Sequence, residues 1–359
     1  MAKKYLPLEI LGQAAVSEEI REQAKARDPM TADFLSGETD TVDMDDFLNW
    51  LLGPTFLKSA YDGPYRNFNE LLLRLYHTRD AGKGLSYSEA RKKFRGICSL
   101  RSILTCWSKE KQAYRFDPDF TEELVRTTSV NVPVSALMHL PFRCFYLDLA
   151  GLPFEPALGL FVYVGFERET GLPNLGVLEA IPPKEGDDQY QLGPILYSAK
   201  EMRKQGKIQE TDKGYVLSFT KKDVPEEHTG KLLLFLLQAI LYLSSEKPDT
   251  VENPKIKVSN AGKKKEQSAP VTLTDVGVRY GTVIRKGKKQ AKTRYIQAEP
   301  TGRRRTMKSH VRSAHWHHYW TGKGRTNLTV KWIPPVFVSG HGDDLPVTIH
   351  PVKKGKCGR

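Results

Sequence analysis

Three runs of aromatic and aliphatic residues decide the fold of this chain: FRCFYLDL at residues 142–149, LFVYVGFE at 160–167 and LGVLEAI at 175–181. Gly-Leu-Pro triplets at 151–153 and 171–173 separate the runs. Short apolar runs divided by such turn-forming residues are typical of adjacent strands. The pattern therefore predicts a three-stranded antiparallel meander.

The residues after the meander predict the rest of an α+β core. Tyr215–Phe219 has the composition of a further strand, and the apolar run Lys231–Ser244 predicts a helix that covers one face of the sheet. The most apolar part of that run, Leu232–Leu243, is too short to cross a bilayer, which takes about 20 residues. We therefore expect residues 131–250 to form an α+β core domain with no membrane partner.

The sequence differs in character on the two sides of this core. Residues 1–130 predict a mainly helical region, because apolar residues recur there at helical spacing. Residues 251–270 are rich in Lys, Ser and Gly and predict a basic linker. Residues 271–359 are expected to form a basic, β-containing arm. Within it, Val271–Ile284 and Leu328–Val338 predict strands, and Lys286–Lys292 predicts a basic turn.

Positive charge is concentrated in the last third of the chain. Residues 251–359 hold 24 Lys and Arg against 6 Asp and Glu, whereas the formal net charge of the whole chain is only +13. Such a block attracts a polyanion, which could be RNA, DNA, the ribosome surface or an acidic lipid.

The cysteines and the first residues predict a cytoplasmic protein. The chain has four cysteines and no CxxC pair, a pattern that favours reduced thiols over a disulfide framework or a zinc ribbon. Pro7 and Glu9 interrupt the N-terminal sequence where a signal peptide would need an apolar run, so we expect no secretion.

The sequence RRRTMKSHVRSAHWHHYW at residues 303–320 is the densest cluster of basic, imidazole and aromatic side chains. Basic side chains pair with phosphates, and aromatic rings stack on bases or pack against a partner. Trp320 and Trp332 are expected to be buried instead, because alternate residues of a strand face inward. The candidate RNA- or partner-binding residues are Arg303, Arg304, Arg305, Lys308, His310, Arg312, His315, Trp316, His317 and Tyr319.

Two kinds of catalytic site remain as alternatives. His315 and His317 would share one strand face and could bind a metal, but no nearby residue supplies the carboxylate or thiolate that would complete the shell. Alternatively, a histidine could act as general base in RNA cleavage, with arginines against the developing phosphorane charge. Asp148, Glu167 and Glu179 end neighbouring runs and could hold two metal ions. However, the chain has no GxxxxGK[ST], GxGxxG or HExxH motif. Without a complete catalytic motif, we lean towards a protein that is not an enzyme, and we expect no cofactor and no metal.

The C-terminal cluster also carries a family resemblance. The residues that resemble the C-terminal signature of a type V-A anti-CRISPR family are His310, Arg312, His315, Trp316, His317, Tyr319, Trp320, Gly322, Val330, Trp332 and Pro335–Val338. Leu140, Pro141, Cys144, Tyr146 and Asp148 are similar to the central strand motif of the same family.

The resemblance implies a phage or mobile-element protein that acts inside a bacterium. Members of this family lower the level of the type V-A CRISPR effector by translation-dependent loss of its messenger RNA, and they recognise its nascent N-terminal polypeptide. The corresponding hypothesis is an adaptor whose body binds the polypeptide, whose arm holds RNA or the ribosome, and whose complex is degraded by host ribonucleases. A ribonuclease and a nucleic-acid-binding regulator of a mobile element remain alternatives.

Overall fold

The computed structural model describes residues 5–13, 100, 102–126, 129–167, 170–197, 199–211, 214–220, 228–253, 271–297, 310–312, 314–324, 327–334 and 336–338. Its helices are α1 (Leu6–Gln13), a helical segment at 102–110, α8 (Pro118–Arg126), α9 (Val134–Leu137), α10 (Ala199–Lys204), α11 (His228–Leu243) and α12 (Val278–Gln297). Its strands are β1 (Gln112–Phe116), β2 (Ser129–Pro133), β3 (Cys144–Asp148), β4 (Gly159–Phe166), β5 (Pro173–Ile181), β6 (Gln191–Tyr197), β7 (Ile208–Thr211), β8 (Gly214–Thr220), β9 (Thr250–Glu252), β10 (Thr272–Val276), β11 (His310–Arg312), β12 (His315–Thr321), β13 (Asn327–Ile333) and β14 (Val336–Val338).

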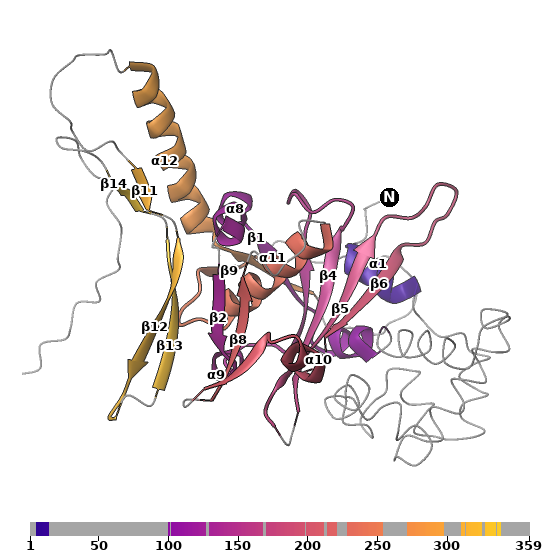
Figure 1. Ribbon diagram of the computed structural model, residues 1–359. Helices are drawn as coiled ribbons and strands as arrows, with labels where there is room; N and C mark the ends of the chain where they lie inside the picture. Colours follow the sequence, from indigo (N-terminus) through magenta and orange to yellow (C-terminus); the bar gives the residue numbers. More distant parts are fainter. Residues whose placement is uncertain are drawn as a thin grey trace, which may run out of the picture.

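A seven-stranded mixed sheet forms the centre of the molecule, in the order β6-β5-β4-β3-β1-β10-β9 (Figure 1). Strands β3, β4, β5 and β6 run antiparallel in chain order, so the predicted meander is confirmed and gains a fourth strand. Strand β1 lies between β3 and β10 and is parallel to both. The predicted α+β class is therefore confirmed.

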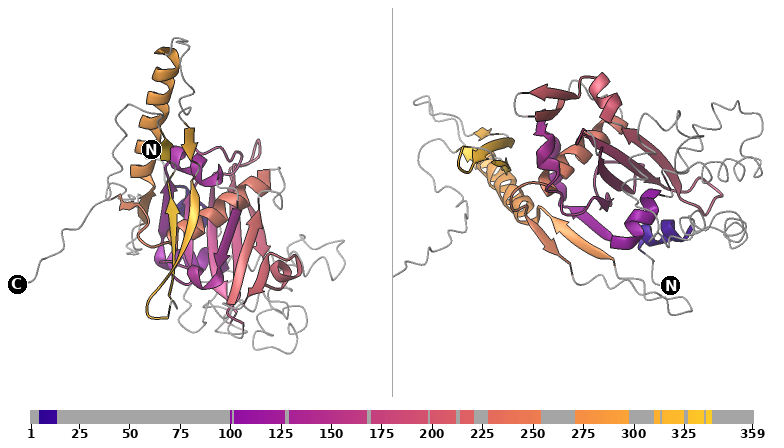
Figure 2. Two further views of the ribbon diagram at one scale, coloured as in Figure 1. Left: turned by 60° about the vertical axis from the view of Figure 1, so that its left-hand side comes forward. Right: turned by 90° about the horizontal axis from the view of Figure 1, so that it is seen from below.

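Helix α11 packs against one face of this sheet, as its apolar sequence predicts. The Phe235 ring lies 5.4 Å from Phe116 of β1 and 4.8 Å from Phe154. On its other side, α11 faces a three-stranded sheet in the order β2-β8-β7 (Figure 2). Leu237 of α11 and Leu217 of β8 line one small apolar pocket between these layers. No helix among the described residues is long and apolar enough to cross a membrane.

The opposite face of the central sheet carries a second aromatic cluster. Trp107, from the helical segment at 102–110, is fully buried, and its ring lies 5.2 Å from Phe161 and 6.4 Å from Tyr146. Tyr5, next to α1, contacts the same Tyr146 ring at 6.3 Å. The described residues before 127 thus form helices around β1, and residues 14–99 of the expected helical region lie outside the described residues.

The prediction for the start of the basic arm was wrong in two places. The strand expected over Val271–Ile284 ends at Val276, and the basic turn expected at Lys286–Lys292 is part of the 20-residue helix α12. Gly277, with φ of 76°, makes the turn between strand and helix. Asp249, which precedes β10, caps the helix by accepting a 2.8 Å hydrogen bond from the Arg279 amide. Because the cap comes from outside the segment, the local sequence gives no sign of where the helix begins.

Because β10 pairs with β1, the central sheet extends on both sides of the expected 131–250 core. Gln112–Phe116 aligns in parallel with Thr272–Val276 along the full length of both strands. The arm therefore begins inside the sheet. Helix α12, the two-stranded β11/β14 sheet and the β12–β13 hairpin lie together on one side of the molecule (Figure 1). The predicted strand at Leu328–Val338 corresponds to β13 and β14.

Candidate functional site

The β12–β13 hairpin sorts the His/Trp motif onto two faces. Its antiparallel register pairs Trp316 with Trp332 and His317 with Lys331. Side chains alternate along a strand, so the two tryptophans share one face, and His315, His317 and Tyr319 share the other. The expectation that the two histidines lie on a common face agrees with this register.

The tryptophan face anchors the hairpin to the body. Trp332 is only 6% exposed, and its ring lies 4.9 Å from Phe120 of α8 and 5.3 Å from Tyr280 of α12. The indole nitrogen of Trp316 donates a 2.6 Å hydrogen bond to Oε1 of Gln238 in α11. The predicted burial of Trp332 is thus confirmed, whereas the side chain of Trp320 lies outside the described residues.

The opposite face of the hairpin, which we call the His–Tyr face, consists of His315, His317, Tyr319 and Lys331. The three ring-bearing side chains on β12 are exposed. The rings of His317 and Tyr319 lie 4.2 Å apart, and Lys331 Nζ lies 5.5 Å from the Tyr319 ring centre. Lys331 also pairs with Glu246 at 2.9 Å. Exposed aromatic rings beside a cation can stack on bases and contact phosphate, or pack on a peptide.

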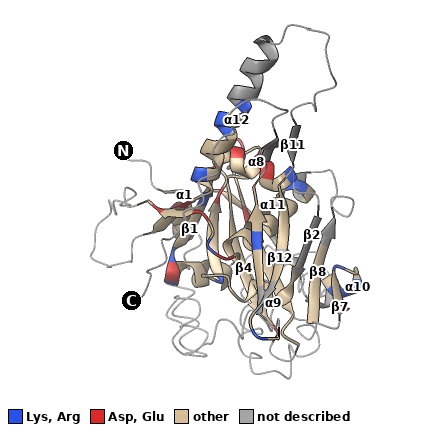
Figure 3. Ribbon diagram, turned by 90° about the vertical axis from the view of Figure 1, so that its left-hand side faces the viewer, with Lys and Arg blue, Asp and Glu red and all other residues tan. Residues whose placement is uncertain are grey.

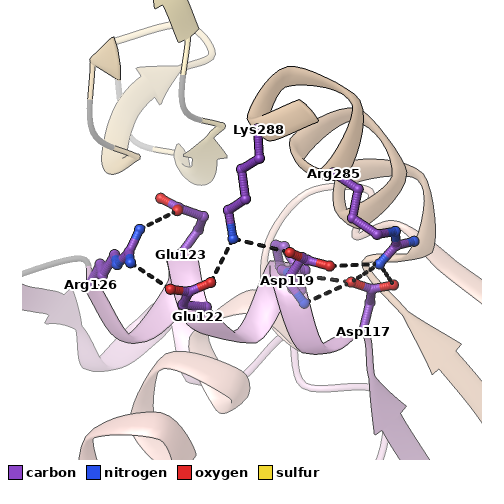
Figure 4. A network of polar contacts seen from close by, with 8 residues as sticks. Asp117, Asp119, Glu122, Glu123, Arg126, Arg285 and Lys288 are labelled. Carbon is purple, nitrogen blue, oxygen red and sulfur yellow. Dashed lines mark hydrogen bonds and ion pairs between the residues drawn. The ribbon is translucent and has the colours of Figure 1, made fainter. Parts of the chain in front are cut away.

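Next to the hairpin, the basic helix α12 lies beside α8 (Figure 3), and acidic side chains in and just before α8 hold it (Figure 4). Arg285 donates to Asp117 and Asp119 at 2.9–3.0 Å. Lys288 donates to Asp119 at 3.0 Å and to Glu122 at 2.6 Å. Asp117 also accepts from two amides at the start of α8 and so caps that helix. Part of the positive charge of the arm is therefore neutralised within the protein.

Two carboxylates of this α8–α12 network, Asp119 and Glu122, have lowered pKa values. Partial burial alone would raise the pKa of Asp119, but hydrogen bonds from Lys288 and Arg285 outweigh that effect and hold it below the ordinary 3.8. The hydrogen bond from Lys288 holds the pKa of Glu122 below its ordinary 4.5. A carboxyl group with a lowered folded-state pKa adds stability above its unfolded pKa, and that stability is lost as pH falls through the folded pKa.

We expect the double change Asp119→Asn and Glu122→Gln to lower the free energy of unfolding by at most about 1 kcal/mol near neutral pH, since these pairs are partly exposed to solvent. The difference from the parent protein should shrink as pH falls below the ordinary pKa values of 4.5 and 3.8. Urea unfolding at a series of pH values measures this. A difference that stays constant down to about pH 3 would contradict it.

The carboxylates considered as a two-metal site do not converge. The register aligns Leu147 with Leu160 and Leu160 with Glu179, so Glu179 lies on the face that carries Leu147, whereas Asp148 lies on the opposite face. Glu167 follows the far end of β4, whose first residue pairs with Asp148. Burial raises the pKa of Asp148. No group of three or more potential metal ligands occurs among the described residues.

Several predicted binding residues lie outside what the structure describes. Arg303, Arg304, Arg305 and Lys308 fall in the gap between α12 and β11. His310 and Arg312 belong to β11, whose backbone pairs with β14, and their side chains are not described.

The sequence pattern did not predict the residues that position the His/Trp motif. Gln238, which receives the Trp316 hydrogen bond, and Glu246, which pairs with Lys331, both come from around α11. Lys331 lies in the alternating strand that follows the motif, and this alternation was the one signal that could have placed its side chain on the His–Tyr face. Its place opposite His317 depends on the hairpin register, which the sequence pattern does not give.

The chain matches the model of a known protein family. The family model AcrVA2-like, described as the anti-CRISPR type V subtype A2 family, matches residues 114–340, more than half of the 359-residue chain. A solved structure described as the crystal structure of AcrVA2 is similar over 86% of this chain and 98% of its own, with 18% sequence identity and a TM-score of 0.42. No curated protein matches the chain.

Proposed function

The chain belongs to the anti-CRISPR type V subtype A2 family, and from that membership we propose that it lowers the level of a type V-A CRISPR effector by translation-dependent loss of the effector's messenger RNA. In this proposal, a phage or another mobile element supplies the protein, which acts in the cytoplasm of the bacterial host. The body of the protein binds the nascent N-terminal polypeptide of the effector. The basic arm holds RNA or the ribosome, and host ribonucleases degrade the message.

The observation that carries the adaptor hypothesis is the two-faced hairpin. Trp316 and Trp332 fix it to α8, α11 and α12, whereas His315, His317 and Tyr319 remain exposed. A rigid platform with an exposed ring surface can bind a partner with little loss of conformational freedom. This arrangement supports recognition as the task of the motif.

The same geometry gives less support to the ribonuclease alternative. Asp148 and Glu179 lie on opposite sheet faces, so they cannot flank one phosphate. The ring of His317 packs against Tyr319. Purified protein incubated with naked RNA, with magnesium or with EDTA, tests this alternative directly. Cleavage that His315→Ala or His317→Ala abolishes would replace the adaptor hypothesis with direct catalysis.

The test of the proposed function is a reporter whose coding sequence begins with the N-terminal codons of a type V-A effector. We expect reporter message to fall when this protein is co-expressed. A matched reporter encodes the same peptide with synonymous codons, so that only the RNA sequence differs. A second reporter carries a frameshift, which changes the peptide with few nucleotide changes. Loss that follows the peptide supports the proposal. Equal loss of all three messages would instead favour a general nucleic-acid-binding regulator.

A salt titration tests the proposed RNA contact of the arm. If Arg303, Arg304, Arg305, Lys308 and Arg312 each meet a phosphate of single-stranded RNA, the slope of log affinity against log salt should be about −3 to −4. Changing all five to Gln should flatten the slope by a similar amount for unrelated RNA sequences. A quintuple variant with an unchanged slope and full reporter activity would mean that these residues only keep the arm soluble.

A further inference from the structure

The strand edges of the two larger sheets are short or carry proline. The central sheet ends at β9, which has 3 residues, and at β6, which contains Pro194. The three-stranded sheet ends at β7, with 4 residues, and at β2, which ends in Pro133. Short edge strands and proline, which has no N–H, prevent the addition of a further strand.

Strand β12 is different. It has 7 residues, from His315 to Thr321, with no proline or glycine. All of them align with β13 on one side, and among the described strands none pairs with the other side of Trp316–Thr321. The far side of β13 is partly used, because the Glu246 amide donates to the Val330 carbonyl at 3.1 Å. In an antiparallel pair, alternate residues direct their N–H and C=O groups away from the partner, so β12 presents such groups outward.

We propose that this edge of β12 binds the nascent effector polypeptide as an added β-strand, an inference that rests on the proposed function and assigns its peptide site. A polypeptide that leaves the ribosome is still extended, so its backbone can pair with an open strand edge. The tryptophan anchors hold β12 in place before the peptide arrives, which lowers the entropic cost of pairing.

The surroundings of the edge indicate the chemistry of the peptide. On the outer side, alternate peptide side chains lie beside His315, His317 and Tyr319, and exposed Lys323 lies in the turn that follows β12. These rings and the Lys323 cation favour aromatic and acidic peptide residues as cross-strand neighbours. The peptide therefore has aromatic or acidic residues at every second position. RNA lacks the repeated amide N–H and C=O groups that match a strand edge, so we assign the edge to a peptide.

The test uses the full-length protein and synthetic peptides of about 12 residues that tile the N-terminal region of a type V-A effector, with binding measured by fluorescence anisotropy. The best peptide is then N-methylated at one backbone position at a time. Each methyl group removes one N–H donor. Methylation at every second position should weaken binding about five- to tenfold, because one hydrogen bond is lost. The positions between should change it by less than twofold.

A pair of protein variants gives the matched control. His317→Pro and His318→Pro each remove one N–H of β12, and only one of these faces the open edge. The variant that loses the outward N–H should keep the melting temperature and lose most peptide affinity. The variant that loses a β13-facing N–H should melt earlier. A peptide that binds equally to the stable proline variant overturns the inference.

Other outcomes separate this inference from the proposed function. Binding that no methyl group weakens, no binding of any effector peptide, or binding of RNA alone at the hairpin would each overturn strand addition. If the reporter message still falls in a peptide-dependent way in such a case, the proposed function stands and the peptide site lies elsewhere. If the reporter test itself fails, the proposed function fails with it.

Discussion

Replacing Trp332 with alanine is expected to lower the free energy of unfolding by about 3–5 kcal/mol, the usual cost of emptying a large aromatic core site. The Trp332 side chain is 6% exposed and packs edge-on against Phe120 at 4.9 Å and against Tyr280 at 5.3 Å. Those rings belong to α8 and α12, so the lost contacts join three elements. Urea unfolding followed by tryptophan-independent circular dichroism measures the change.

The matched control for Trp332→Ala lies on the other face of the hairpin. Tyr319 is 39% exposed, and Tyr319→Ala should alter stability by less than about 0.5 kcal/mol, as surface substitutions usually do. The two variants should therefore separate stability from recognition. If Trp332→Ala left the unfolding transition unchanged, the hairpin would not be anchored through this ring, and the adaptor hypothesis would lose its main structural support.

The parts of the fold that the sequence predicted are those with local signals. The meander has apolar runs separated by Gly-Leu-Pro turns, and α11 has a continuous apolar sequence, so both could be found without tertiary information. The burial of Trp332 followed from strand alternation alone. In each case, the residues that define the element also lie next to one another in the sequence.

Helix α12 shows why other parts could not be predicted. Its cap, Asp249, comes from before β10, and its basic residues Arg285 and Lys288 pair with carboxylates about 170 residues earlier in the chain. From the local sequence, these lysines and arginines indicate only a solvated turn. The parallel pairing of β1 with β10 is equally remote. Contacts between distant segments, and not propensity, therefore determine this helix.

The candidate site was predictable to a similar extent. Alternation places His315 and His317 on one face, and the structure agrees. The residues that orient the hairpin, Gln238 and Glu246, carry no recognisable motif, because an amide on an apolar helix and a carboxylate shortly after it can have many roles. Asp148 and Glu179 could be placed on opposite faces only with the strand register known, since a shift of one residue would have brought both to the same face.

The other large effect is expected where β10 turns into α12. Gly277 has φ of 76°, and a Cβ added there would lie 2.1 Å from Cδ1 of Phe120. Gly277→Ala therefore adds left-handed backbone strain of about 1–2 kcal/mol and overpacking of about 1–3 kcal/mol. Phe120 is fully buried against Tyr242 and Trp332, so its ring has little room to move away. We expect a total loss of about 2–5 kcal/mol in urea unfolding.

Gly171 offers a control that separates the two contributions. Its φ is 65°, close to that of Gly277, but a Cβ there would meet no atom within 4 Å. Gly171→Ala should therefore cost only the strain of about 1–2 kcal/mol. The difference between the two variants measures the crowding against Phe120. Equal losses would mean that the Phe120 ring moves aside without cost, and then the junction of α8, α12 and the hairpin would be less tightly packed than the ring distances around Phe120 indicate.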